Sequence, residues 1–195
     1  KIAVGDTVEV WPAKVTSKVK SIITFEKELK SARQGESVTI TLADEIDASR
    51  GDIFVGKKTP VETGNRFVST LLWMSEEEMV PNKPYWIKTR AKLLSGTISE
   101  PNYKLNVNTL EKSKASTLTL NEIGQCVCDF DQDIAFEPYT QNPHLGSFIV
   151  IDRQTNNTVG MGLIEERVGQ ESWAQRHVAE RNKCWSKGLL STDHR

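Results

Sequence analysis

Hydrophobic and polar residues alternate in short runs along this chain, as they do in half-buried β-strands. Val8 and Val10 fall on one face of a first strand, and Val38, Ile40 and Leu42 fall on one face of another. Turn-forming residues such as glycine, aspartate and asparagine separate these runs. Short strands at this spacing predict an antiparallel barrel or sandwich.

The clearest hairpin is expected near residue 155. Residues 147–152 form an apolar run, residues 155–157 read Thr-Asn-Asn, and residues 158–163 return as a second run. The aliphatic residues of the return run share one side, and Gly160 and Gly162 take the other. Glycines at such positions indicate a bulge or the close approach of another group.

A connector divides the chain into two strand-rich parts. Residues 56–65 have a connector's composition, with a lysine pair, a proline and a glycine. We therefore expect one domain over residues 1–57 and a second over 58–165. Residues 171–187 have helix-forming composition, which predicts a helical tail or linker over 166–195.

Composition indicates a cytoplasmic protein that has neither a membrane nor a nucleic acid as partner. Hydrophobic residues make up 37% of the 195 residues and charged residues 26%, and no apolar run is long enough to span a membrane. The formal net charge of −1 gives no electrostatic reason to expect nucleic acid binding.

The cysteines and the first residues bear on the cellular compartment. Three cysteines are too few for a disulfide framework, and the first residues do not form a signal peptide. The chain lacks an initiator methionine, so we expect it to be a fragment.

The sequence shows no pattern that predicts catalytic, cofactor-binding or metal-binding residues. A phosphate-binding GxxxxGK[ST] loop and a dinucleotide-binding GxGxxG loop are both absent from the sequence. Cys126 and Cys128 would share one face of a strand, where two thiols could bind a soft metal or cycle between redox states. We favour a place in the core, since free cysteines are among the most buried residues. Acidic clusters at 44–47 and 76–78 are expected to be solvated turns.

Short motifs follow one another along the chain in this order: Val15–Ile22, Gln34–Glu36, Asp44–Asp52, Leu72–Met74, Tyr85–Lys88, Leu105–Glu111, Leu118–Gly124, Ala135–Tyr139, Gly146–Arg153 and Thr155–Gly162. In this order they resemble the second and third domains of the GTPase subunit of bacterial sulfate adenylyltransferase. Each motif alone is weak, because elongation-factor-like GTPases share the Gly-Asp turn and the final Thr-Val-Gly hairpin. The ordered set is specific.

The resemblance implies an all-β fold of two antiparallel barrels like domains 2 and 3 of elongation factor Tu, with a short C-terminal helical segment. It also implies that Lys1 lies inside the first barrel, which would be truncated at its N-terminus. In this family a GTPase domain binds GTP and Mg, and a separate small catalytic subunit condenses ATP and sulfate to adenylylsulfate and pyrophosphate. We expect the barrels to be part of that nucleotidyltransferase but inactive alone. The tail could lead into a fused adenylylsulfate kinase.

As docking elements, the barrels would contact the small catalytic subunit and their own GTPase domain. The candidate contact residues are polar members of the matching motifs: Arg50, Asp52, Asn108, Thr109, Asn121 and Glu122. Polar residues in turns also bond to nearby backbone, which is the competing interpretation.

Two other functions remain open. A translation-type GTPase fragment would use such barrels to hold tRNA, although the near-neutral charge argues against that role. A stand-alone protein-interaction module is the other alternative.

Overall fold

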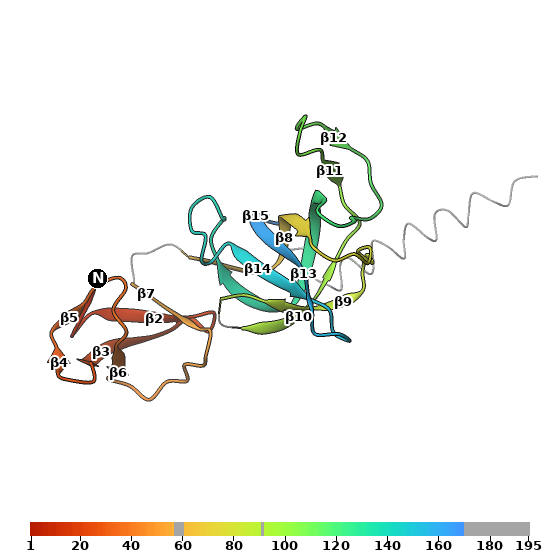
Figure 1. Ribbon diagram of the computed structural model, residues 1–195. Coiled ribbons are helices and arrows are strands. Elements are labelled where there is room, and N and C mark those ends of the chain that lie inside the picture. The colour runs from red at the N-terminus through yellow and green to blue at the C-terminus, as the bar shows by residue number, and fades with distance from the viewer. Residues whose placement is uncertain (57–60, 91, 170–195) are drawn as a thin grey trace, which may run out of the picture.

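The structure, a computed structural model, describes residues 1–56, 61–90 and 92–169. Within these residues every regular element is a strand, and the strands form two bodies (Figure 1). We call the body formed by residues 1–56 the half-barrel and the body formed by residues 61–169 the closed barrel. The predicted all-β fold with two barrel-like units is confirmed. The expected helix lies outside the described residues, among which no helix is long and apolar enough to cross a membrane.

The half-barrel contains the first group of strands: β1 (Ile2–Ala3), β2 (Thr7–Trp11), β3 (Val15–Ile23), β4 (Glu28–Leu29), β5 (Ser31–Ala32), β6 (Thr39–Leu42) and β7 (Ile53–Gly56). Strands β4, β3, β2 and β7 neighbour one another in that order, β6 also pairs with β3, and β1 pairs with β5. All of these pairings are antiparallel.

The alternation of the sequence decides which face of the half-barrel is buried. Val8 and Val10 on β2 are 3% and 0% exposed, and Val38, Ile40 and Leu42 pack against the small apolar core. The predicted inward faces of both strands are therefore confirmed.

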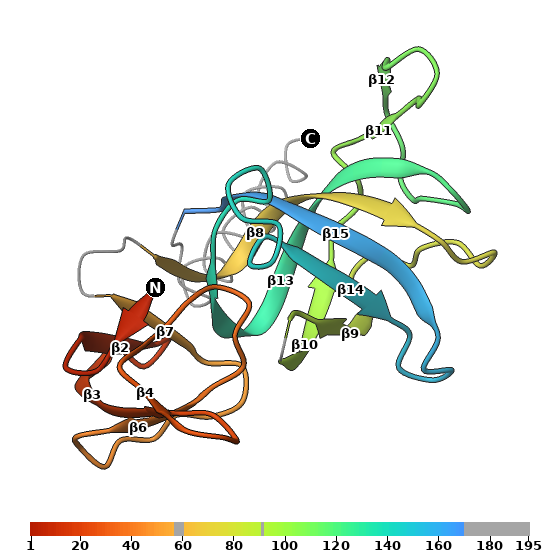
Figure 2. The ribbon, with the colours of Figure 1, turned by 60° about the vertical axis from the view of Figure 1, so that its left-hand side comes forward.

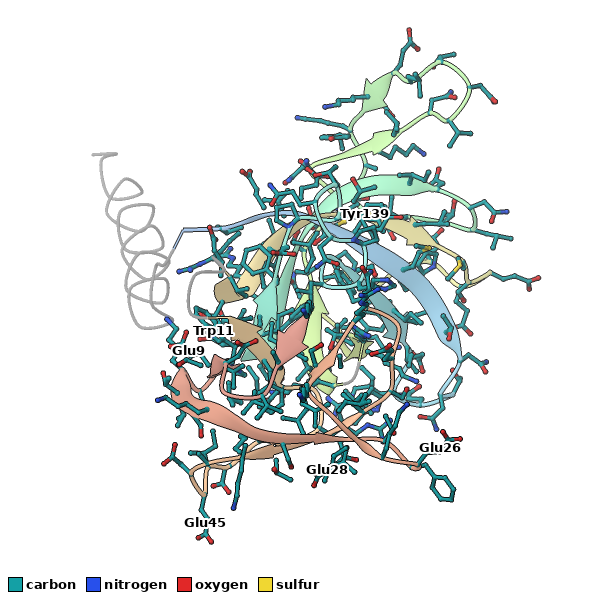
Figure 3. All side chains as sticks on the ribbon, turned by 90° about the vertical axis from the view of Figure 1, so that its left-hand side faces the viewer. Glu9, Trp11, Glu26, Glu28, Glu45 and Tyr139 are labelled. Carbon is teal, nitrogen blue, oxygen red and sulfur yellow. The ribbon has the colours of Figure 1, made fainter. Side chains whose placement is uncertain are left out.

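The opposite face of the half-barrel is polar. On β2, Trp11 Nε1 donates a 2.8 Å hydrogen bond to Glu9 Oε2, and both side chains are labelled in Figure 3. Glu26, Glu28 and Glu45 are exposed on the same body (Figure 3).

The closed barrel contains the remaining strands: β8 (Glu62–Trp73), β9 (Pro84–Lys88), β10 (Leu93–Ile98), β11 (Tyr103–Leu105), β12 (Lys112–Ser113), β13 (Ile123–Phe136), β14 (Ser147–Ile151) and β15 (Thr158–Arg167). Strands β10, β9, β14, β15, β8 and β13 neighbour one another in that order, and pairing of β10 with β13 closes the ring. Closure leaves these six strands without a free edge.

Aromatic rings fill the interior of the closed barrel. The Phe67 ring centroid lies 5.3 Å from that of Phe130 and 4.8 Å from that of Phe136, and Phe130 contacts Phe148 edge-on at 5.3 Å. These four side chains are at most 4% exposed. Fully burying one such ring contributes about 1.5–3 kcal/mol, so this cluster supports the barrel.

The predicted hairpin near residue 155 is confirmed as β14 and β15. Phe148 pairs with Gly162, and a Cβ on Gly162 would overlap the Phe148 ring. Glycine is therefore required at this position because the ring lies over the backbone.

The closed barrel has two ends with different neighbours (Figure 2). The junction end, where β9 ends and β10 begins, faces the half-barrel. The arm end, where β8 ends and β13 begins, carries the β11–β12 hairpin, which we call the arm. The arm projects away from the barrel wall (Figures 1 and 2).

Candidate interaction surfaces

An ion pair connects the half-barrel to the closed barrel at the junction end. Asp52 Oδ1 lies 2.9 Å from Lys92 Nζ, and the two side chains are 11% and 20% exposed. The turn before β7 positions Asp52, whose Oδ2 accepts a 2.9 Å hydrogen bond from the Ser49 N–H. The Asp52 N–H in turn donates to Ser49 O at 3.0 Å. The structure thus places Asp52 in a contact between the two bodies of this chain.

Gly51 allows this contact to form. Its φ of +97° lies in the left-handed region, which glycine adopts without strain. A Cβ at this position would overlap the Lys92 side chain. The Gly51-Asp52 turn therefore lets the lysine pass close to the backbone and reach the carboxylate.

The environment of Asp52 stabilises its charged form. Partial burial alone would raise its pKa, but the hydrogen bonds from Lys92 and from the Ser49 N–H outweigh that effect. The pKa of Asp52 is consequently lowered, and the carboxylate remains charged at neutral pH.

A cavity of about 160 Å³ lies beside the Asp52–Lys92 pair. Side chains from both bodies line it, among them Pro12, Ile53, Arg90, Ile134 and His144. Arg50 is exposed and lines an adjoining open hollow. Of the six predicted contact residues, only Arg50 and Asp52 lie at this junction.

Asn121 and Glu122 form a turn at the arm end that holds β8 and β13 together. The Trp73 N–H donates to Glu122 O at 3.0 Å, and the Asn121 N–H donates to Trp73 O at 2.8 Å. Asn121 has a φ of 62°, a left-handed conformation that asparagine tolerates well. Both residues therefore have a structural role here, whatever else they contact.

Glu122 is held by an ion pair as well. Its Oε1 lies 2.6 Å from Lys104 Nζ at the base of the arm, and its Oε2 accepts a 3.0 Å hydrogen bond from the Thr119 N–H. The bond from Lys104, followed by that from Thr119, lowers the pKa of Glu122. This pair ties the arm to the barrel.

Asn108 and Thr109 lie at the exposed tip of the arm. Asn106 Oδ1 accepts hydrogen bonds from the N–H groups of Asn108 at 2.9 Å and Thr109 at 3.3 Å. Across the turn, the Asn106 N–H donates to Glu111 O at 3.0 Å, and the Leu110 N–H donates to Asn106 O at 2.8 Å. The tip is therefore an ordered turn built from its own hydrogen bonds.

The loops of the arm end also carry exposed apolar side chains, which polar sequence motifs did not reveal. Five of the large hydrophobic residues that are at least 38% exposed belong to its loops: Met74, Val80, Val107, Leu110 and Leu120. Apolar residues inside otherwise polar turns were the signal that could have indicated them. We call these five residues the apolar arm-end set.

The two cysteines of β13 belong to the core of the closed barrel. Cys126 and Cys128 are both 0% exposed, and burial raises the pKa of the Cys126 thiol to about 12. The predicted core position is confirmed. Among residues 1–56, 61–90 and 92–169, no group of three or more His, Cys, Asp or Glu side chains could hold a metal ion.

Comparison with known proteins supports the resemblance seen in the motifs. Sulfate adenylyltransferase subunit 1 of Aliarcobacter butzleri is 43% identical over 171 residues, which are 88% of this chain and 36% of that protein. Subunit 1 of Shewanella woodyi is 42% identical over 180 residues, 92% of this chain and 38% of that protein. The bifunctional enzyme CysN/CysC of Xylella fastidiosa is 39% identical over 168 residues, 86% of this chain and 27% of that protein. The chain spans little more than a third of the subunit 1 relatives.

Solved structures show the same fold at low sequence identity. Crystal structures of sup35 complexed with GMPPNP and with GDP both match at a TM-score of 0.77, with 18% and 19% identity. Each match covers 86% of this chain and 42% of the solved one. A family model described as GTP-eEF1A C-terminal domain-like matches residues 66–165, which lie within the closed barrel and make up just over half of the chain. The chain therefore belongs to the GTP-eEF1A C-terminal domain-like family.

Proposed function

We propose that this chain is the non-catalytic barrel part of the GTP-dependent subunit of a sulfate adenylyltransferase. In that role it supports the condensation of ATP and sulfate to adenylylsulfate and pyrophosphate. The observation that carries the proposal is the identity of about 42% to proteins named sulfate adenylyltransferase subunit 1, over some nine-tenths of the chain. Alone, the chain has no activity in this proposal, and GTP and Mg bind to a separate GTPase domain.

The proposed role of the barrels is to dock two partners, the GTPase domain and the small catalytic subunit. Formation of a phosphoric-sulfuric anhydride is strongly uphill, so GTP hydrolysis must be coupled to it. A nucleotide moves a conformational equilibrium only through its different affinity for two states, and rigid bodies in contact with both partners can transmit that difference. A closed barrel is suited to this task because its strands are all paired.

The predicted contact residues divide between two surfaces in this proposal. Arg50 and Asp52 serve the junction, where the half-barrel and the closed barrel are kept in one orientation. Asn108, Thr109, Asn121 and Glu122 serve the arm end, where a partner can bind without displacing the half-barrel. The division into 1–57, 58–165 and a tail over 166–195 belongs to the same proposal, as does an adenylylsulfate kinase fused beyond the tail. The two-function name of the Xylella fastidiosa relative is compatible with that fusion.

A binding experiment tests the proposed function. The 195-residue chain is immobilised and exposed to the small catalytic subunit from the same source, and GTP binding is measured in parallel. We expect the chain to retain the small subunit and not to bind GTP. A folded chain that retains none of the small subunit would contradict the proposal and favour a general interaction module.

A further inference from the structure

The arm tip presents two aliphatic side chains to solvent. Val107 is 57% exposed and Leu110 is 70% exposed, within a turn whose other members are polar. Hydrogen bonds from Asn106 hold this turn in shape. The fold of the tip therefore depends on polar groups, and the two aliphatic side chains add little to it.

Leu110 also has an unfavourable backbone conformation. Its φ of 59° lies in the left-handed region, where a leucine is strained and where glycine or asparagine would be comfortable. Strain of this kind persists where the surrounding structure imposes it, and it concentrates at binding and switch sites. Asparagine at this position would fold the turn with less strain than leucine does. The exposed leucine side chain therefore indicates a binding role.

Charges around the tip specify the kind of surface that it fits. Lys104 is already paired with Glu122, but Lys112 lies over the Tyr103 ring at 4.1 Å, and Lys114 is exposed just beyond it. The tip thus combines an aliphatic centre with a rim on which two exposed lysines, Lys112 and Lys114, outnumber one carboxylate, that of Glu111, whose Oε2 accepts a 3.3 Å hydrogen bond from Thr109 Oγ1. Its complement is an apolar pocket with carboxylates on its rim.

A separate polypeptide is the occupant that needs such an anchor. A domain on the same chain is held nearby by its linker at high effective concentration, and weak contacts are enough to dock it. A separate subunit must be held by contacts alone, and a few desolvated side chains in pockets usually supply most of that energy. The half-barrel already occupies the junction end, whereas the arm end is free of it.

We propose that Val107 and Leu110 insert into an apolar pocket of the small catalytic subunit, and that the arm is the main anchor of that subunit on the barrels. This inference rests on the proposed function, because it names the surface through which the proposed partner binds. The remaining members of the apolar arm-end set, Met74, Val80 and Leu120, lie on loops of the barrel itself and are not part of this anchor.

The test is a double variant that keeps the turn and removes its aliphatic centre. Val107→Thr preserves side-chain shape, and Leu110→Asn places a residue that accepts the left-handed conformation. We expect affinity for the small subunit to fall by about tenfold or more, with the thermal midpoint unchanged or slightly raised. Ile149→Thr is the matched control, since Ile149 is 40% exposed on the barrel wall away from the arm, and it should bind as the wild type does.

A second measurement needs no substitution. Amide hydrogen exchange of the wild-type chain should slow at residues 106–111 when the small subunit is added.

A conservative variant completes the test. Leu110→Met, which keeps an apolar side chain, should retain binding. If the wild-type chain binds but the double variant binds equally well, or the arm amides stay unprotected, the arm is not the anchor although the proposed function stands. If the wild-type chain does not bind the small subunit at all, the proposed function itself is contradicted.

Discussion

Lys83 Nζ lies 2.6 Å from Asp152 Oδ2 and joins the loop before β9 to the turn between β14 and β15. The other carboxylate oxygen, Oδ1, accepts hydrogen bonds from the N–H groups of Gln154 at 2.8 Å and Thr155 at 3.0 Å. The bond from Lys83, followed by those from Thr155 and Gln154, holds the pKa of Asp152 well below its usual range. A single buried carboxylate thus organises two loops at the arm end.

Replacing Asp152 with asparagine should destabilise the closed barrel. The amide oxygen can still accept from the turn, so Asp152→Asn removes mainly the charge that Lys83 pairs with. We expect a loss of about 1–2 kcal/mol in the free energy of unfolding by urea at neutral pH. Asp131→Asn, at an exposed position of β13, is the control and should change little.

The difference in the free energy of unfolding between wild type and Asp152→Asn should become smaller as the pH falls. Because the folded pKa is lowered, the contribution of the charged carboxylate is complete above the unfolded pKa of about 4 and declines as the pH falls below it. Urea unfolding at a series of acidic pH values measures this difference. A gap of constant size down to about pH 3 would contradict the assigned pKa shift.

The junction ion pair should couple the two bodies thermally. Lys92→Met keeps the side-chain stem beside Gly51 but removes the Nζ that pairs with Asp52. We expect the half-barrel to unfold at a lower temperature than the closed barrel in calorimetry, with a weakening of about 1–2 kcal/mol at the junction. Lys20→Met, the same substitution at an exposed position of β3 that lines neither the cavity nor the hollow, is the control. A single transition at the wild-type temperature in Lys92→Met would show that other contacts hold the bodies together.

Gly162→Ala should disrupt the β14–β15 hairpin. The added methyl would overlap the buried ring of Phe148, and forcing an extra methyl group into a packed core costs about 1–3 kcal/mol. A Cβ on Gly169 meets no atom within 4 Å, so Gly169→Ala is the matched control. Equal urea midpoints for the two variants would mean that the ring moves aside without cost.

Much of the architecture could be predicted from local pattern. Alternation identified the inward faces of β2 and β6, and the Thr-Asn-Asn turn identified the β14–β15 hairpin, because each depends on residues close together in sequence. The ordered motifs indicated the family. Helix formation after residue 170 stays a prediction, since that segment lies outside the described residues.

The contacts that define the two surfaces could not be predicted in this way. Asp52 pairs with a lysine 40 positions away, and Asp152 with one 69 positions away, so only the folded topology brings their charges together. Polar motif residues were also misleading guides to exposure, because the Glu122 side chain is taken up by an ion pair with Lys104 at the base of the arm, while the tip of the arm exposes Val107 and Leu110. Their roles in partner binding stay predictions.

The burial of Cys126 and Cys128 makes these thiols reporters of unfolding. A raised pKa and a core position leave little reactive thiolate in the native state, so iodoacetamide should modify them only as the closed barrel opens. Peptide mass spectrometry separates them from Cys184, which lies outside the described residues. Rapid modification of either β13 thiol in the folded protein would contradict its place in the core.

Strand β13 runs as one continuous strand between the two surfaces of the molecule. Its first residue, Ile123, pairs with Leu105 of the arm, and near its other end Ile134 lines the cavity at the junction. Its 14 residues correspond to about 40 Å measured along the strand, which bends with the barrel wall (Figure 2) and has an irregularity between Asp129 and Ile134. Because β13 is paired with β8, β10 and β11, a tilt of the closed barrel relative to the half-barrel would carry the arm with it. The same tilt would change the angle at which a bound subunit is presented, without any change in the contacts that hold it.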